Sequence, residues 1–282
     1  MKKHLSALLL VTAAIATPAF AQEPLKLPAL SPKASIHQEF STSFIDITYS
    51  RPSARGRKVF NDVVSYGEVW RTGANGATKI QTGEDLMIGG KLVKAGEYAL
   101  YTIPGKDQWE IILNEGTGNW GVSGYDKEDD VLRIIVKTTQ LRDAVQTFTI
   151  NIENIRLNSC TIELSWDKTK VSIPVIAPNE ERLAKSIDQA INRPSLPYNQ
   201  AANYYLETGK NLDLAMDYAN KAIEQNPKAF YLYYLKARIA QKQGNKSETI
   251  KAAQMSMELA KGTAYEHEYM RNNEQLIKAV KK

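Results

Sequence analysis

The chain has 282 residues, with 36 basic and 31 acidic side chains, a formal net charge of +5 at pH 7 and a single cysteine. One cysteine excludes an internal disulfide, so packing has to stabilise the fold. Residues 22–176 carry a net charge of −1 and residues 177–282 one of +4. Neither part has the strongly positive character of a protein that binds nucleic acid.

The N-terminus has the pattern of a secretory signal peptide. Lys2 and Lys3 precede an apolar run from Leu5 to Ile15, and Ala19-Phe20-Ala21 supplies the small residues of a cleavage site. This pattern predicts removal of residues 1–21, export across the inner membrane and a periplasmic location. Because the run is shorter than the roughly 20 apolar residues that span a bilayer, and no later segment is longer, we expect no membrane-spanning part.

The next two segments differ in their patterns. Residues 22–32 contain three prolines and no apolar period, which predicts a flexible leader. Residues 33–176 alternate apolar and polar side chains in short runs separated by glycine and proline turns. This period of two predicts an antiparallel β-sandwich or barrel-like domain. We expect strands at 34–40, 45–49, 78–82, 85–88, 91–93, 97–103, 109–114, 131–137, 146–155, 159–166 and 170–176.

Two irregular segments interrupt the predicted strands. The first, from Tyr49 to Ala77, combines basic and aromatic side chains, and the second, from Glu115 to Asp130, is rich in glycine. Guanidinium groups match anions, and aromatic rings stack on sugars. We therefore expect the two segments to meet at one end of the β domain and bind a small anionic ligand or a glycan. The candidate ligand-binding residues are Arg51, Arg55, Arg57, Tyr66, Trp70, Arg71, Asn75 and Trp120.

A purely structural role competes with ligand binding. Arginine side chains in a long loop also form ion pairs, and such networks use the same residue types as functional sites. The second irregular segment ends in an acidic run that would pair with the arginines of the first and hold the two segments together. The acidic residues are Asp126, Glu128, Asp129 and Asp130.

Conventional catalytic motifs are absent from the sequence after residue 21. Its only histidines, His37 and His267, lie in different predicted domains, so we expect neither a histidine metal site nor a catalytic triad. No phosphate-binding glycine loop or dinucleotide fingerprint occurs, so we expect no cofactor. The enzymatic alternative is a hydrolase of envelope components or glycans that uses Tyr66, or carboxylates such as Asp62 and Glu68. The sequence assigns no catalytic residue.

From Asn179 to the C-terminus the composition is that of helices. Asn179 can begin a helix, and Glu180 and Glu181 suit its first turn. Tyrosine, alanine and glycine then recur with a period of roughly 34 residues, and this spacing resembles the tetratricopeptide repeat. Residues 179–282 are therefore expected to form helical repeats that bind a protein or peptide. Tyr198, Ala202, Tyr205 and Gly209 recur as Tyr233, Ala237, Ala240 and Gly244.

Several long motifs in the β part resemble a single family. YSRPSARGRKVF, YGEVWRTGANGAT, AGEYALYTIPG and WEIILN, then NWG followed by DVLR, resemble in this order the bacterial exported proteins of the domain of unknown function 2911. The likeness runs from about Ser31 to Ile176. It implies an extracytoplasmic β domain, often followed by helical repeats, with no established activity. The family more usually carries glutamate where this chain has Gly76, so a role that needs that carboxylate has no counterpart here.

Overall fold

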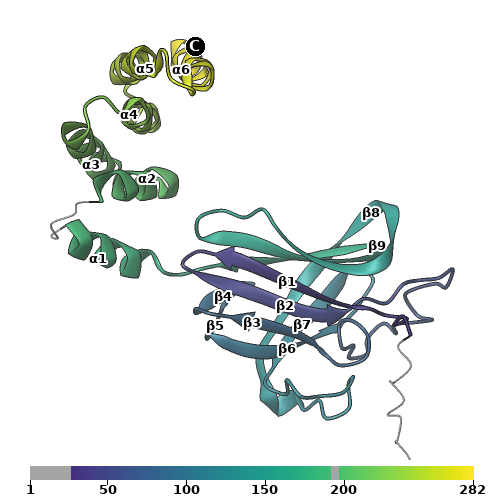
Figure 1. Ribbon diagram of the computed structural model, residues 1–282. Helices are drawn as coiled ribbons and strands as arrows, with labels where there is room; N and C mark the ends of the chain where they lie inside the picture. Colours follow the sequence, from purple (N-terminus) through teal and green to yellow (C-terminus); the bar gives the residue numbers. More distant parts are fainter. Residues whose placement is uncertain (1–26, 192–196) are drawn as a thin grey trace, which may run out of the picture.

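The computed structural model describes residues 27–191 and 197–282, and the predicted signal peptide, residues 1–21, lies outside them. The described part consists of nine antiparallel β-strands followed by six α-helices (Figure 1), which confirms the predicted fold class. The strands are β1 (Lys33–Phe40), β2 (Ser43–Ser50), β3 (Thr78–Thr82), β4 (Leu86–Ile88), β5 (Lys91–Val93), β6 (Gly96–Ile103), β7 (Gln108–Asn114), β8 (Asp130–Glu153) and β9 (Ser159–Ile176). The helices are α1 (Glu180–Ile191), α2 (Tyr198–Thr208), α3 (Leu212–Gln225), α4 (Phe230–Lys242), α5 (Lys246–Ala260) and α6 (Glu266–Lys281).

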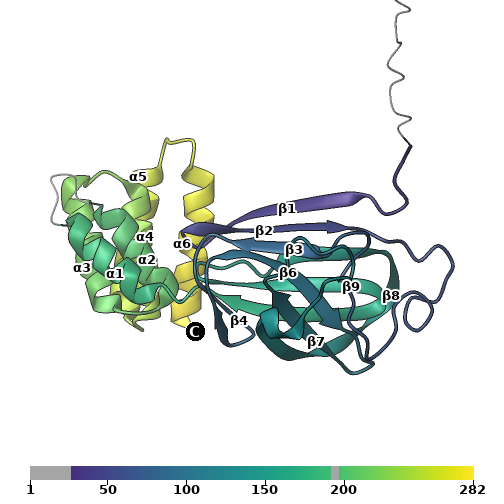
Figure 2. The ribbon, with the colours of Figure 1, turned by 90° about the horizontal axis from the view of Figure 1, so that it is seen from below.

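The strands are hydrogen-bonded in the order β1-β2-β3-β6-β7-β8-β9-β4-β5. The first part of β8 pairs with β7 and its second part with β9, so this strand connects two layers of the sheet (Figures 1 and 2). The chain after β2 returns to β8, where Ser53 forms a bridge with Thr147. Most buried apolar side chains of both layers form one core, and Ala99, Tyr101 and Ile112 form a smaller cluster on β6 and β7.

The end of the β domain differs from the sequence prediction. We expected four strands at 131–137, 146–155, 159–166 and 170–176, and the structure has two long ones, β8 and β9. Residues 138–145 contain no glycine or proline, so β8 continues through this stretch with shifts of register on either side of Val145. In β9, Asp167 has a φ of 50° and produces an irregularity without ending the strand.

An aromatic cluster fills the centre of the core. The Trp70 ring lies 4.9 Å from that of Phe148, 5.8 Å from Trp166 and 6.0 Å from Trp109, measured between centroids. Its indole N–H donates to the carbonyl of Gly73 at 3.0 Å, so its polar atom has a partner inside the protein. Because Trp70 belongs to the first irregular segment and the other rings to β7, β8 and β9, the cluster fixes this segment to both layers.

Small buried side chains allow the helices after α1 to pack closely. Ala202, Ala219, Ala237 and Ala253 are completely buried. Gly209 ends α2 with a φ of 69°, a left-handed conformation that glycine adopts without strain. Within the described residues, no helix carries an apolar stretch that is long enough to cross a membrane.

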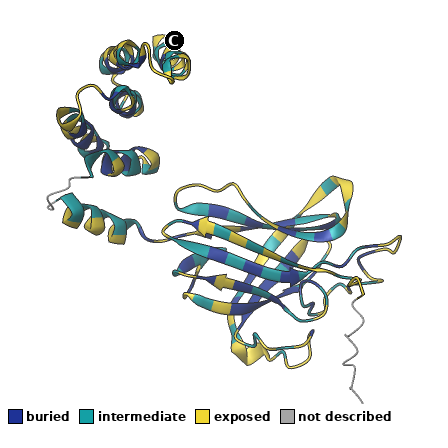
Figure 3. Ribbon diagram, in the orientation of Figure 1, coloured by how far each residue is buried: buried dark blue, intermediate teal, exposed yellow. Residues whose placement is uncertain are grey.

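Polar contacts attach α1 to the β domain. α1 has no buried residue (Figure 3), but Arg182 forms an ion pair with Glu84 at 2.9 Å and donates to Thr42 at 2.7 Å. The side chain of Asn179, which the sequence placed at the helix start, donates to Glu84 at 3.3 Å and to Ser41. The orientation of the helical part therefore depends on a few hydrogen bonds near the β1–β2 turn.

The aromatic cluster generates a prediction about stability. Replacing Phe148 by alanine removes a completely buried ring and should lower the free energy of unfolding by about 3–5 kcal/mol. Urea denaturation followed by circular dichroism measures this loss. Ile135→Ala is the control, because that side chain is 65% exposed and its truncation should cost about 0.5 kcal/mol or less. Equal losses for both variants would contradict the role given to the cluster.

Cys160 supplies a second prediction, which concerns pH. Burial raises the pKa of its thiol to about 11. The unfolded chain therefore releases this proton at a lower pH than the folded protein does. The neutral thiol thus contributes its full share to the free energy of unfolding below pH 9, and this share is lost as the pH rises toward 11. The midpoint of urea unfolding should fall less over this range in Cys160→Val than in the unmodified protein. Identical pH profiles would contradict the shift.

Candidate functional site

The structure gives two of the predicted arginines internal partners. Arg51 donates to the carbonyl of Phe148 at 3.1 Å and to the hydroxyl of Thr149 at 2.7 Å, so it holds the end of β2 against β8. Arg57 donates to two backbone carbonyls of its own loop, each at 3.0 Å. Among the described residues, neither guanidinium group forms an ion pair. Both therefore shape the loop.

Three further predicted residues of the first irregular segment, Arg55, Tyr66 and Trp70, do not line the hollow beside Trp120. Arg55 has a φ of 51° and donates to the carbonyl of Leu30 in the leader. Tyr66 stacks on Phe60 with 5.4 Å between ring centroids, and burial, with a smaller contribution from Asp167, raises the pKa of its hydroxyl. Trp70 lies in the core, as described above. The predicted set is therefore not gathered into one cavity.

Arg71, Asn75 and Trp120 do come together, at the place where the two irregular segments meet. Arg71 donates to the carbonyl of Asn75 at 3.0 Å. Its guanidinium lies so close to Gly121 that a Cβ there would be 2.9 Å from Nη1. Asn75 and Trp120 line one hollow of about 270 Å³. Asn75 and Trp120 are therefore placed to contact a common ligand, whereas Arg71 does not line this hollow and supports the backbone of Asn75.

A network of hydrogen bonds holds the second irregular segment in place. Arg133 contacts Asp130 at 2.6 Å, Glu110 at 2.8 Å and the hydroxyl of Tyr125 at 2.8 Å. Asn114 also donates to Asp130, at 2.9 Å. Burial lowers the pKa of Arg133, but these partners outweigh it and raise the pKa above its ordinary value. The acidic run is thus anchored by an arginine of β8, and the described arginines of the first segment form no ion pair with it.

Two glycines leave room for the side chain of Asn119, the residue before Trp120. A Cβ at Gly116 would lie 2.4 Å from Nδ2 of Asn119, and one at Gly124 would lie 2.6 Å from Oδ1. Asn119 thus fills space that only glycine leaves open, beside the completely buried Tyr101. Burial raises the pKa of the Tyr101 hydroxyl, and Asn119 offsets part of this increase. From this packed base, the Trp120 ring is 71% exposed. A fixed and uncovered indole is suited to stacking on a ligand.

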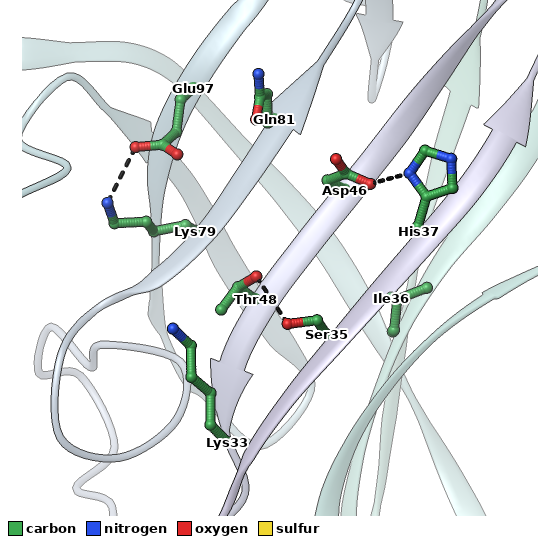
Figure 4. A pocket seen from close by; sticks show the side chains of 9 residues that line it. All are labelled: Lys33, Ser35, Ile36, His37, Asp46, Thr48, Lys79, Gln81 and Glu97. Atoms are coloured by element: carbon green, nitrogen blue, oxygen red, sulfur yellow. Dashed lines mark hydrogen bonds and ion pairs between the residues drawn. The ribbon is translucent and has the colours of Figure 1, made fainter.

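A polar groove, here called the sheet groove, runs over the outer face of β1, β2, β3 and β6 (Figure 4). Its main hollow has a volume of about 480 Å³. Lys33, Thr48 and Lys79 line this hollow and also the one beside Asn75 and Trp120, so the two are continuous. The main hollow is lined by Lys33, Ser35, Ile36, His37, Asp46, Thr48, Lys79, Gln81 and Glu97.

Most charged side chains of the sheet groove are paired across neighbouring strands. His37 Nδ1 lies 2.6 Å from Asp46 Oδ1, and Lys79 Nζ lies 3.0 Å from Glu97 Oε1. Lys33 forms no ion pair within the described part of the chain. Its ammonium group is therefore the charge that a ligand can neutralise, at the point where the two hollows join.

Sequence reasoning missed the sheet groove because its residues are divided among four strands, with four residues from β1, two each from β2 and β3 and one from β6. The polar positions of β1 and β2 were visible as alternation, and, as a functional residue, His37 was considered only as a metal ligand or a member of a catalytic triad. Pairing then places His37 opposite Asp46 and Ser35 opposite Thr48, which the sequence does not specify. Within the described ranges, no group of three or more His, Cys, Asp or Glu side chains is arranged to hold a metal ion.

Comparison with known proteins identifies one match. A family model described as a protein of unknown function (DUF2911) matches residues 31–175. No curated protein and no solved structure matches the chain. The matched region contains both irregular segments and all residues of the sheet groove.

The network around Arg133 generates a prediction about the Trp120 segment. Asp130→Asn removes one of the two carboxylate charges that Arg133 faces, and we expect a loss of about 1–3 kcal/mol in the stability of this segment. Backbone amides of residues 115–125 should exchange their hydrogens faster, whereas those of β6 and β7 stay protected. Hydrogen exchange followed by mass spectrometry measures both. Asp129→Asn is the control, since Asp129 is exposed and its side chain makes no contact with Arg133. Equal exchange in the two variants would contradict the anchoring role.

Proposed function

Because the chain belongs to the DUF2911 family of proteins of unknown function, we propose a function from the site itself: the β domain binds an extended acidic glycan in the sheet groove. Trp120 stacks on one sugar ring, and Lys33 contacts a carboxylate. The observation that carries this proposal is a continuous groove in which an exposed indole lines the smaller hollow, while Lys33, which forms no ion pair with any described residue, lies where the two hollows join.

The chemistry of the groove matches a polyhydroxylated ligand. The hydroxyls of Ser35 and Thr48, 3.2 Å apart, and the side chains of Asn75 and Gln81 supply donors and acceptors along its length. Pockets for compact small molecules are mostly apolar and cover most of the ligand. This groove is open and polar, which favours a chain of sugars over a compact apolar molecule.

The arrangement supports binding more than hydrolysis. Glycoside hydrolysis needs two carboxyl groups on either side of the scissile bond. In the sheet groove the two carboxylates, Asp46 and Glu97, are each occupied by a basic partner. Asp62 and Glu68, the carboxylates of the hydrolase alternative, are exposed and do not line the groove.

The setting of this binding domain is part of the same proposal. The N-terminal pattern supports export, and we place the protein in the periplasm, where glycans of the envelope are accessible. The helical part, with its repeated pattern of small residues, serves as a tetratricopeptide-like scaffold for a protein or peptide. The protein thus binds a glycan through one domain and a protein through the other.

Titration calorimetry with oligogalacturonates, and with the same oligomers as methyl esters, tests the proposal. The acidic oligomers should bind and the neutral esters should bind much more weakly. Trp120→Ala should weaken binding about tenfold or more. Lys33→Gln should weaken it and reduce its dependence on salt.

Ile135→Ala is the matched control for this experiment, because its side chain is exposed outside the sheet groove and its loss should leave the affinity unchanged. Binding that is unaffected by Trp120→Ala would place the ligand elsewhere. A lack of binding to acidic oligomers would overturn the proposed ligand class.

A further inference from the structure

A second hollow, which we call the hinge groove, lies between α1, α2 and the β domain. Its volume is about 330 Å³, and its lining is mainly apolar. Ser41 and Thr42 of the β1–β2 turn form part of its rim. The apolar lining comes from Leu157, Leu183, Ile187, Ala190, Ala201 and Tyr204.

The leader carries apolar side chains that nothing in the described part of the chain covers. Leu27 is 71% and Leu30 is 74% exposed. The backbone of this stretch is nevertheless held, because Arg55 donates to the carbonyl of Leu30 and the N–H of Arg51 donates to that of Pro32 at 2.9 Å. The first irregular segment therefore fixes the leader with two leucines exposed to solvent.

The spacing of these leucines suits insertion into a groove. The leader is rich in proline, which favours the polyproline II conformation with three residues per turn. In that conformation Leu27 and Leu30 project from the same side of the chain. Together they form a short apolar edge that is more exposed than most other apolar side chains of the β domain.

The leader cannot reach the hinge groove of its own chain. The groove rim lies at the end of β1, whereas the leader joins its start, and eight residues of strand at about 3.3 Å each separate them by roughly 25 Å. From Pro32, which is held by Arg51, Leu27 lies only five residues away and spans at most about 18 Å. Figures 1 and 2 both show the start of β1 at the end of the β domain remote from the helices.

We propose that the hinge groove binds the leader of a second copy of this chain. Leu27 or Leu30 enters the apolar hollow between α1 and α2, and the two molecules join head to tail. Charge does not oppose this arrangement, because Glu23 offsets Lys26 in residues 22–32 and the leader itself brings no net charge to the helical region, which has one of +4. Two different surfaces form the contact, so copies add in rows or close into a ring.

Sedimentation velocity of the chain without residues 1–21 tests the proposal. The average mass should rise with concentration, because a contact of this size gives weak association. The leader variant Leu27→Ser/Leu30→Ser and the groove variant Ala190→Trp should each remain monomeric alone. Mixed together, they should form a complex of one copy of each and nothing larger, because one variant retains an intact groove and the other an intact leader.

A synthetic peptide of residues 24–32 provides a second measurement. It should dissociate the oligomers of the unmodified chain and bind the leader variant, and it should bind the groove variant about tenfold more weakly or worse. If Ala190→Trp alters the circular dichroism spectrum, Ser186→Trp, at an exposed position of the same groove, replaces it. A monomer at all concentrations, or oligomers that survive both variants, would overturn the proposal. Peptide binding that is equal in both variants would also overturn it.

Discussion

The position of Trp70 determines how the first irregular segment is arranged. Its backbone exchanges two hydrogen bonds with Thr102 of β6, at 2.7 and 2.9 Å, and its ring packs among aromatic residues of both layers. A segment without regular structure thereby acquires a fixed path. Arg71 and Asn75 follow within a few residues, so their position beside Trp120 is a consequence of this anchor.

The contrast between fold and site shows what the sequence could predict. Alternating side chains such as Phe148 and Ile150 identify strands locally, so the class of the β domain was accessible. The partners of Arg51 and Arg57 are mainly backbone carbonyls, and every residue has one. The sequence does not show which carbonyl an arginine will contact, so the residue pattern indicated only ion pairs or an anion site. Neither Arg51 nor Arg57 has an acidic partner among the described residues.

The sheet groove was inaccessible for a different reason. Its residues come from four strands, of which only β1 and β2 are joined by a short turn, and their alignment depends on pairing such as that of His37 with Asp46. Trp120 was recognisable because glycines flank it and leave its ring uncovered. Lys33 was not, because one lysine at the start of a strand resembles any solvated lysine until its neighbours are known.

The attachment of α1 has a mechanical consequence. A helix without buried side chains is joined to the β domain mainly by polar contacts, here those of Arg182 and Asn179 with Glu84 and the β1–β2 turn. Water and dissolved ions compete for such contacts, so the stiffness of this joint depends on the medium. An assembly built from these molecules would be pliable in strong electrolyte and more rigid in dilute solution, while each β domain kept its own shape.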